Sequence, residues 1–382
     1  MQTLAIIASV DFQKLLLGNE ERNIGGTASV IKNILNYLHF DLILLLGITN
    51  KKSELNTIIP ISQKIIFIPI VYIPIRNIIP QRLHVFYKSR VINKFLKRYD
   101  IDVIYSHSME MSFWLDRNLN TVEHMHGAVN AINLSKYNYL RIRLISNLWE
   151  FIRKKVLLKA KQIIAIDEAC FELASKYNNQ RNIHLIRNFV DTSVYFRDKN
   201  ISGILSKNIK SKIVLFVGRI EEVKGLQLFV DAIAELRKHS NEWIGVVVGK
   251  GTYEGTLRSY ISYQQMDDAI VFTGPVYDQN ELRKIYNQAE ILLLTSYHEG
   301  IPMTILESLA CGTPVLATDV GGISKLADGK MPCFIIKERN ALLFANKIFE
   351  ITASPKTEYQ NFPYSSLSIS KKINKILKNE ER

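Results

Sequence analysis

Two acidic side chains, Glu299 and Glu307, stand at the ends of the stretch "EGIPMTILE". At about 100° per residue, eight positions along an uninterrupted helix would leave these side chains about 80° apart. Gly300 and Pro302 disfavour such a helix, although proline suits a first helical turn. We therefore expect Glu299 in a loop and Glu307 in the helix after it. Both carboxylates would then border one pocket for a polar ligand, with helix N-terminal amides between them.

A second interpretation of this stretch needs no ligand. "TILE", Thr304 to Glu307, matches the capping-box pattern, in which the glutamate returns a hydrogen bond to the backbone at the start of a helix. The spacing alone slightly favours this interpretation over a ligand site.

Two basic side chains, Arg219 and Lys224 in "FVGRIEEVKG", follow one predicted strand and precede a helix that begins near Gly225. Ligands of open α/β sheets bind at the carboxyl ends of strands, so two cations there could hold a phosphate group. An ordinary solvated loop explains them about equally well, because lysine and arginine are common on surfaces.

Glycines precede two predicted helices. "NIGGTASVIKNIL" places Gly25 and Gly26 where a bare backbone and helix amides could receive an anion, or where the chain simply turns. "VVVGKGTYEG" only loosely matches the dinucleotide-binding fingerprint, and the acidic residue expected further along is missing. A tight turn after the strand explains this second stretch better.

His107 and His126 stand at the carboxyl ends of predicted strands, where a histidine can orient a hydroxyl group or carry a proton. More often such a histidine is only a hydrogen-bonded polar residue. His126 is the better candidate, because Gly127 after it permits close approach of a ligand.

"DID", 100–102, has the form of a metal-binding D-x-D. It lies at the start of a strand, which is the wrong end for a site in this kind of sheet, so we reject it as a metal site.

The residues named above are positioned by the strands and helices around them. Along the chain, short apolar runs alternate with segments of helical spacing, and this pattern is typical of parallel sheets covered by helices. Strands are predicted at 4–10, 42–47, 65–70, 102–107, 122–126, 162–166, 183–187, 212–218, 243–249, 269–274, 291–296, 314–318 and 333–336. The polar stretch 191–211 divides the series, which predicts two doubly wound domains. The end of the chain has Leu367, Ile369, Ile373, Ile376 and Leu377 at near-helical spacing, so we expect a terminal amphipathic helix.

The net charge of +13 is concentrated in the first half of the chain. Met1–Val190 holds 25 Lys+Arg against 14 Asp+Glu, which indicates an anionic partner such as a lipid surface or a phosphorylated substrate. No recognition motif supports a nucleic acid as this partner.

Three cysteines without paired spacing favour a reducing, cytoplasmic setting. The start of the chain lacks a basic region, which favours a first strand over a signal peptide, and no apolar run is long enough to span a membrane.

The segment 136–161 has eight Lys+Arg and one acidic residue, with apolar and aromatic side chains between them. A basic amphipathic helix of this kind can lie on an anionic membrane. It can equally cover the sheet, and we expect Leu144, Leu148 and Phe151 to face the sheet. Both roles can coexist, because only the basic side need meet lipid.

Taken together, these motifs resemble the retaining glycosyltransferases of family 4. The matching stretches are "GG" (25–26), "HG" (126–127), "NFVD" (188–191), "VGRIEEVKG" (217–225), "VVVGKGTYEGTL" (246–257) and "EGIPMTILESLACGTPVLATDVGG" (299–322). The resemblance implies a GT-B fold, an α/β architecture of two Rossmann-like parallel-sheet domains that face a cleft. It implies an acceptor-binding domain over 1–190, a nucleotide-sugar domain over 191–358 and a crossover helix over 359–382 that packs back on the first domain.

The resemblance also implies roles for individual residues. Arg219 and Lys224 would hold the donor diphosphate, Glu299 the hydroxyls of the transferred sugar, and Glu307 the ribose. Gly25 and Gly26 would let the first domain close on the donor, and His126 would lie by the sugar and the acceptor. The backbone that would contact sugar and phosphate comprises Gly300, Ile301, Pro302, Met303 and Thr304.

The resulting hypothesis is a retaining transferase that needs no metal or other cofactor. It would move a sugar from a UDP- or GDP-linked donor to a lipid-linked or phosphorylated glycan in bacterial surface polysaccharide synthesis, such as O-antigen, capsule or lipopolysaccharide. We expect it in the cytoplasm, peripherally bound to the inner face of the plasma membrane. The alternatives are a catalytically silent GT-B scaffold and a nucleotide-sugar epimerase, which would turn over the donor without an acceptor.

Overall fold

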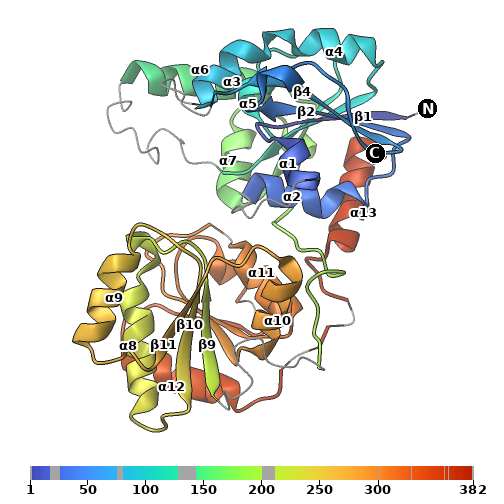
Figure 1. Cartoon of the computed structure of the whole chain (residues 1–382). Helices are drawn as coiled ribbons and strands as arrows, with labels where there is room; N and C mark the ends of the chain where they lie inside the picture. The colour runs from blue at the N-terminus through green and yellow to red at the C-terminus, as the bar shows by residue number, and fades with distance from the viewer. Residues whose placement is uncertain are drawn as a thin grey trace. The chain divides into compact units, whose positions relative to one another are not determined.

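The structure is a computed structural model that describes residues 2–17, 26–74, 81–127, 143–199, 211–300, 302–327, 329–356, 358–359 and 361–380. The described chain forms two compact units (Figure 1). Among the described residues, the first unit comprises those up to Arg187 together with those from Leu367 onward, and the second unit comprises those in Asn188–Ser366. Each unit is a sheet covered by helices, parallel except for the edge strand of the first unit, and the alternation of apolar runs and helical segments predicts this layout.

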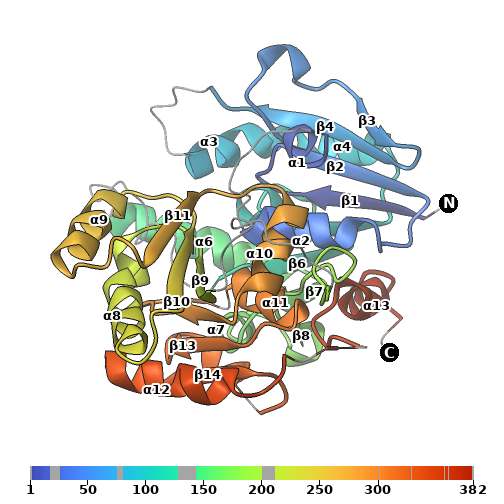
Figure 2. The ribbon, with the colours of Figure 1, turned by 60° about the horizontal axis from the view of Figure 1, so that its bottom comes forward.

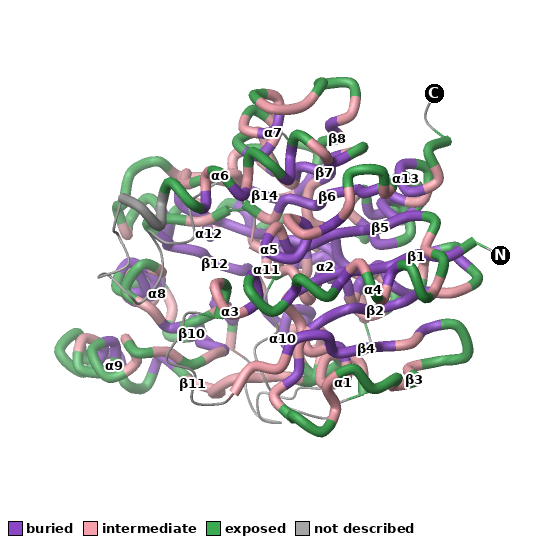
Figure 3. Tube along the Cα trace, turned by 90° about the horizontal axis from the view of Figure 1, so that it is seen from above, coloured by how far each residue is buried: buried purple, intermediate pink, exposed green. Residues whose placement is uncertain are grey.

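The first unit is built on an eight-stranded sheet in the order β3-β4-β2-β1-β5-β6-β7-β8. Its strands are β1 (Thr3–Ile7), β2 (Leu42–Thr49), β3 (Ile59–Ser62), β4 (Ile65–Tyr72), β5 (Val103–Ser106), β6 (Thr121–Met125), β7 (Gln162–Ala165) and β8 (Ile183–Leu185). The central strands are buried almost throughout (Figure 3), which explains why they are nearly continuous apolar runs. Only the edge strand β3 was not predicted, because its side chains alternate in exposure and it pairs antiparallel with β4.

Helices cover both faces of this first sheet (Figure 1). They are α1 (Phe12–Leu16), α2 (Gly26–Leu35), α3 (Gln81–Lys88), α4 (Ile92–Arg98), α5 (Met109–Ser112), α6 (Arg143–Lys159), α7 (Glu168–Ser175) and α13 (Ser366–Leu377), with single 3-10 turns at Lys52–Glu54, Ser89–Val91 and Gln180–Asn182. Figure 1 shows α3, α4 and α6 on one face, with α2, α7 and α13 on the other.

The predicted inner face of α6 is wrong. Phe151 is 48% exposed and Leu148 is 36% exposed, whereas Trp149, Ile152 and Val156 are buried. Both sets recur at intervals of three and four residues, so the helix carries two adjacent apolar stripes and periodicity alone cannot choose between them. The side chain of Leu144 lies outside the described residues. The outward surface of α6 is therefore more apolar than the sequence suggested.

The terminal helix α13 packs on the first unit, beside the segment that follows α2. The amide of Asn374 donates to the carbonyl oxygen of Tyr37 at 2.9 Å, and its oxygen accepts from the backbone N–H of His39 at 3.0 Å. Ile369, Ile373, Ile376 and Leu377 are buried. Leu367, which the spacing predicts on the same face, is 55% exposed, because two residues along a helix put it about 200° from the buried Ile369.

The second unit is a six-stranded parallel sheet in the order β11-β10-β9-β12-β13-β14. Its strands are β9 (Lys212–Val217), β10 (Trp243–Val248), β11 (Ile270–Gly274), β12 (Ile291–Leu294), β13 (Val315–Thr318) and β14 (Cys333–Ile336), all six within or close to the predicted runs. Its helices are α8 (Leu226–Arg237), α9 (Glu254–Tyr263), α10 (Gln279–Gln288), α11 (Met303–Ala310) and α12 (Ala341–Thr352), with 3-10 turns η6 (Glu222–Lys224) and η7 (Ile323–Lys325). Figures 1 and 2 show α8 and α12 on one face and α10 and α11 on the other.

The division between the units falls a few residues from the expected places. The sequence predicts the division after Val190 and before Tyr359, whereas the units divide after Arg187 and after Ser366. The backbone N–H of Val190 donates to the carbonyl oxygen of Tyr364 at 2.9 Å, and Ser366 donates to Val190 at 2.8 Å. Because the segment around Val190 pairs with the segment Tyr364–Ser366, both of these segments belong to the second unit.

No helix among the described residues is both long enough and apolar enough to cross a membrane.

Candidate functional site

The second sheet reverses its strand order between β9 and β12. These two strands are parallel neighbours, although β10 and β11 lie between them in the sequence. The connections that leave their carboxyl ends therefore run to opposite sides of the sheet. In open α/β sheets such a reversal point opens a crevice in which ligands bind. Lys224 follows β9 and Glu299 follows β12, so the fold brings both predicted residues to this reversal point.

Lys224 and Glu299 are in direct contact. The Nζ of Lys224 lies 2.6 Å from Oε1 of Glu299, and the hydroxyl of Ser296 donates to the same oxygen at 2.6 Å. The two charged side chains are 17% and 10% exposed, so the pair is partly withdrawn from water. An ammonium group held against a carboxylate in this way can still direct its remaining donors at a phosphate.

The two connections are packed so closely that one position requires glycine. Gly225 has φ 58°, and a Cβ on it would lie 2.3 Å from the carbonyl oxygen of Thr295. The backbone N–H of Tyr297 donates to the carbonyl oxygen of Val223 at 2.8 Å. Arg339 donates to Thr295 at 2.9 Å and lies over the ring of Tyr297 at 3.8 Å. These contacts fix the backbone on both sides of the Lys224–Glu299 pair.

A third loop supports Glu299 from the other side. Gly321 has φ 59°, and a Cβ on it would lie 1.8 Å from the carbonyl oxygen of Glu299. The backbone N–H of Gly322 donates to the carbonyl oxygen of Gly300 at 3.2 Å. The "DVGG" loop after β13 thus positions the loop that carries Glu299.

The capping-box interpretation of Glu307 is wrong. Helix α11 begins at Met303 with Pro302 as its N-cap, so Thr304 lies inside the helix and cannot cap it. Glu307 instead accepts a hydrogen bond from the hydroxyl of Tyr286 at 2.7 Å. Burial raises the pKa of its carboxyl to about 7, although the Tyr286 hydrogen bond acts in the opposite direction. With its pKa raised to about 7, the charge of the Glu307 carboxyl changes near neutral pH.

Arg219 is exposed on the connection after β9, and no described acidic side chain pairs with it. Two glycines in the connection after β10 pack against the backbone on either side of Arg219. A Cβ on Gly249 would lie 1.9 Å from the carbonyl oxygen of Gly218, and one on Gly251 would lie 2.0 Å from that of Ile220. The "GKG" glycines thus serve close backbone packing, in keeping with the preference for a tight turn over a dinucleotide fingerprint.

The remaining predicted donor-binding positions fall at helix starts. Gly300 is exposed, Pro302 caps α11, and Met303 and Thr304 form its first turn, where backbone N–H groups lack helical partners. Gly26 is the exposed first residue of α2. Ile301 and Gly25 lie outside the described residues.

His126 belongs to the first unit, where it forms a cluster with two other histidines. It follows β6, and its Nε2 is 2.8 Å from Nδ1 of His107, which follows the neighbouring strand β5. His124 stacks on His126 with ring centroids 4.5 Å apart. Burial lowers the pKa of His126 to about 4, so its imidazole is neutral at physiological pH. A neutral imidazole can accept or donate a hydrogen bond but adds no positive charge.

"DID" is confirmed to lie at the opposite edge of the first sheet. Asp102 precedes β5, and its carboxylate accepts hydrogen bonds from the backbone N–H of Thr3 at 2.7 Å and from its hydroxyl at 2.9 Å. These bonds lower the pKa of Asp102 and join the beginnings of two strands. The aspartate is structural.

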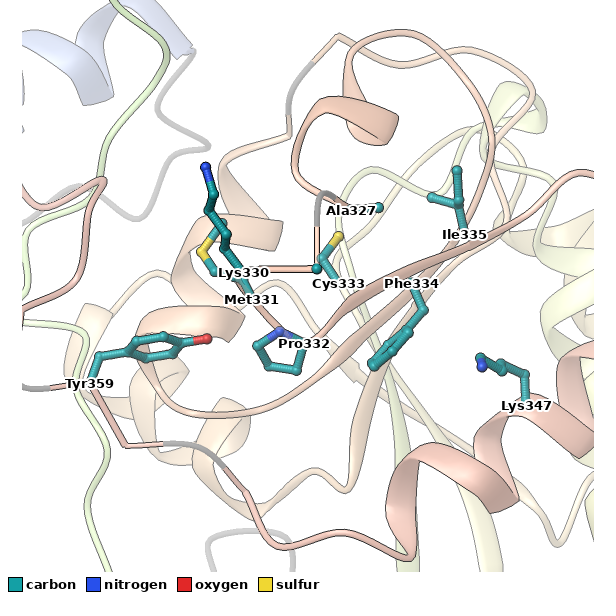
Figure 4. A pocket seen from close by; sticks show the side chains of 10 residues that line it. Ala327, Lys330, Met331, Pro332, Cys333, Phe334, Ile335, Lys347 and Tyr359 are labelled. Carbon is teal, nitrogen blue, oxygen red and sulfur yellow. The ribbon is translucent and has the colours of Figure 1, made fainter.

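The pockets of the second unit include the following two. The one beside Gly225, of 350 Å³, is bordered by the segment that carries Lys224 and is lined by Glu222, Val223, Gly225, Gln227, Tyr253 and Tyr297. A larger one of 490 Å³ lies by β14 and α12, where Lys330, Pro332, Phe334, Lys347 and Tyr359 surround it (Figure 4). This larger pocket contains no residue that the sequence singled out, and acidic side chains are absent from its lining.

Ser296, Tyr286 and Arg339 were missed by the sequence analysis. Ser296 could have been found, because it is a polar residue directly after an apolar strand. No sequence pattern pointed to Tyr286 or Arg339, because the residues they contact, Glu307 and Thr295, are distant from them in the sequence.

Comparison with known proteins covers nearly the whole chain. The family model described as Glycosyltransferase Family 4 matches residues 24–194, and the model described as Glycosyl transferases group 1 matches residues 197–365. HepE of Anabaena, solved in complex with UDP and glucose, has a TM-score of 0.69 with this structure at 16% identity, over 99% of this chain and 100% of that chain. A likeness at this identity shows a shared fold.

Curated relatives match a shorter segment. D-inositol 3-phosphate glycosyltransferase of Arthrobacter sp. (strain FB24) is 38% identical over 122 residues, which are 31% of this chain and 29% of that protein. The lipopolysaccharide core biosynthesis mannosyltransferase LpsB of Rhizobium meliloti (strain 1021) is 32% identical over 123 residues, which are 31% of this chain and 34% of that protein. The chain thus matches about a third of the length of these relatives.

Proposed function

The chain belongs to glycosyltransferase family 4 and has the GT-B fold, and from this we propose that it transfers a sugar, with retention, from a nucleotide-sugar donor to a growing glycan. The observation that carries the proposal is the Lys224–Glu299 pair at the strand-order reversal of the second sheet. A cation for a diphosphate and an acid for sugar hydroxyls stand side by side there.

We propose that Lys224 and Arg219 bind the donor diphosphate and stabilise the negative charge that grows as the diphosphate leaves. Glu299 would accept hydrogen bonds from hydroxyls of the transferred sugar, and Glu307 would accept them from the ribose. UDP is the favoured nucleoside diphosphate, because HepE, of the same fold, holds UDP and glucose. The N–H groups at the start of α11 would add donors for the sugar and phosphate.

The proposed chemistry is a front-face displacement. The diphosphate departs from an oxocarbenium-like carbon and helps to take the proton from the incoming hydroxyl, so the new bond forms on the face that the leaving group vacates. The carboxylates then bind and orient, unlike the acid and base of a glycoside hydrolase. We propose His126 as the catalytic histidine, because its neutral imidazole can orient a hydroxyl at physiological pH. The reaction so written requires no metal ion.

For the acceptor we propose a lipid-linked or phosphorylated glycan of bacterial surface polysaccharide synthesis, met at the inner face of the plasma membrane. The match to LpsB supports this substrate class. The exposed Phe151 and Leu158 of α6, together with exposed Lys154 and Lys155, support contact with an anionic membrane. Apolar side chains could enter the headgroup region while the lysines meet lipid phosphates.

The membrane proposal can be tested by charge reversal on α6. Each basic residue near an anionic surface contributes about 1 kcal/mol, so Lys154→Glu with Lys155→Glu should weaken binding to phosphatidylserine vesicles by at least about tenfold in sedimentation. Lys371→Glu with Lys372→Glu on the exposed side of α13 is the matched control and should change binding less. Equal losses in both double variants would show only a general charge effect.

The donor proposal can be tested by a thermal-shift panel of UDP, GDP, ADP and their sugar conjugates, because a ligand bound only by the folded protein raises its Tm. We expect UDP to stabilise the wild type and to stabilise Lys224→Met far less. Lys238→Met, at an exposed lysine on the same unit, should respond like wild type. Stabilisation by none of the nucleotides would favour a silent scaffold. Conversion of a nucleotide sugar without acceptor would favour an epimerase.

A further inference from the structure

The three histidines at the end of β5 and β6 lie close enough to share one ion. One ring nitrogen from each of His107, His124 and His126 lies within 4.8 Å of those from the other two, and within the described chain this is the sole such group of histidine, cysteine or acidic side chains. His124 lies in β6 and His126 directly after it, two residues apart and so on the same side of the chain, and His107 follows the adjacent strand β5. The sheet therefore fixes the spacing of all three rings.

Two nitrogens of the cluster are buried without a hydrogen-bond partner. His107 is 8% exposed and His124 is 3% exposed, and Nε2 of each has no partner. An unpaired buried polar atom costs about 1–3 kcal/mol, so two in one cluster are unusual in a stable sheet. A ligand that accepts nitrogen lone pairs would satisfy both.

From this geometry we propose that His107, His124 and His126 form a binding site for a transition-metal ion of the Zn²⁺ type. Imidazole nitrogen suits Zn²⁺, Cu²⁺, Ni²⁺ and Fe²⁺ among the common ions. Two nitrogens on a tetrahedral Zn²⁺ are about 3.4 Å apart, since each Zn–N bond is about 2.0–2.1 Å. The three nitrogens lie within 4.8 Å of one another, so the rings would move closer around a bound ion, and the His107–His126 hydrogen bond would give way to the metal bonds.

The surroundings of the cluster suit a metal in two further ways. The Tyr105 hydroxyl lies 2.7 Å from Nδ1 of His124, and when it accepts the Nδ1 proton it leaves Nε2 free to bind an ion. His126 is only partly buried, which gives an ion access from solvent and leaves a coordination position for water.

A bound ion would occupy His126, the histidine proposed for catalysis. If that proposed role holds, the site is inhibitory, because the metal takes the nitrogen that would face a substrate hydroxyl. Metal binding itself requires neither donor nor acceptor. It can therefore be measured, and can fail, independently of the transfer reaction.

The test uses the full chain, freed of metal by a chelator and then titrated with Co²⁺ and Zn²⁺. We expect one equivalent to bind, with the visible absorption of tetrahedral Co²⁺ and a heat of Zn²⁺ binding. His124→Phe, which keeps a stacked ring but removes both nitrogens, should weaken binding at least tenfold. His239→Phe, at an exposed histidine of the second unit, should bind as wild type does.

A measurement on the wild type covers the case in which a variant fails to fold. Of the eight histidines, three should show shifted imidazole NMR signals when one equivalent of Zn²⁺ is added, and these should be 107, 124 and 126. The proposal is overturned if no equimolar binding occurs, if other histidines shift, or if folded His124→Phe binds Zn²⁺ with wild-type affinity.

Discussion

Neutralising Glu299 should strengthen the binding of UDP even as it impairs sugar transfer. Without a ligand, Glu299 holds the ammonium of Lys224 at 2.6 Å. A phosphate oxygen bound to the far side of that ammonium would lie about 2.8 Å from Nζ and thus about 5 Å from the carboxylate. The two negative charges repel each other at that distance. Glu299→Gln removes this repulsion while the amide can still accept a hydrogen bond from Ser296.

The size of the effect follows from Coulomb's law. Two unit charges about 5 Å apart repel by about 1 kcal/mol in water and about 3 kcal/mol at an effective dielectric constant of 20. Because the pair is partly withdrawn from water, we expect a gain within this range, which is about 5- to 150-fold in Kd. The same variant should transfer sugar poorly, because it loses the charged acceptor for the sugar hydroxyls.

Calorimetric titration with UDP at fixed ionic strength measures the effect without a sugar or an acceptor. Glu235→Gln is the matched control, because it removes the same charge from an exposed pair with Lys238 on α8 and should leave Kd unchanged. Adding Lys224→Met to Glu299→Gln should abolish the gain. The reasoning is refuted if Glu299→Gln weakens UDP binding or leaves it unchanged, since Glu299 would then position Lys224 or contact the nucleotide itself.

Two further predictions concern the stability of the second unit, measured by hydrogen exchange of β9 and β12. The pKa of Glu307 is raised from 4.5 to about 7, so its carboxyl stabilises the fold fully below about pH 4.5 and loses that contribution as the pH rises through about 7. The glutamine of Glu307→Gln stays neutral at every pH. The free energy of unfolding of this variant should therefore exceed that of the wild type by up to about 3 kcal/mol near pH 8, and by much less near pH 5. An equal difference at both pH values would contradict this. Gly321→Ala should lower stability by about 1–3 kcal/mol and weaken UDP binding, because its Cβ would displace the Glu299 loop. Gly255→Ala, in open space on α9, should be neutral or slightly stabilising, and a similar loss in both variants would count against the loop argument.

Much of the fold was predictable because buried parallel strands have a strong local signal. All six strands of the second sheet and seven of the eight in the first coincide with apolar runs. The exception, β3, is a half-exposed edge strand, which has no such run. Helix faces were harder to predict. The two apolar stripes of α6 satisfy the same spacing, and only packing against its neighbours decides that Trp149, Ile152 and Val156 face inward.

The candidate site was predictable to the level of residue types and their place after strands. Lys224 and Glu299 could be chosen from the sequence because each follows an apolar strand. Their direct contact could not, because it depends on β12 pairing with β9 and not with β11, the strand before it. The same holds for the histidines, which became a cluster only when β5 and β6 paired.

The two α/β units, the polar residues at the strand ends and the family resemblance were all evident without a structure, because local periodicity and motif spacing are properties of the chain. The tertiary structure alone decided what those residues touch. It replaced the capping role of Glu307 with a hydrogen bond from Tyr286, because α11 begins one residue before Thr304. Strand order and the close approach of loops at Gly225 and Gly321 are long-range contacts, and no local pattern encodes them.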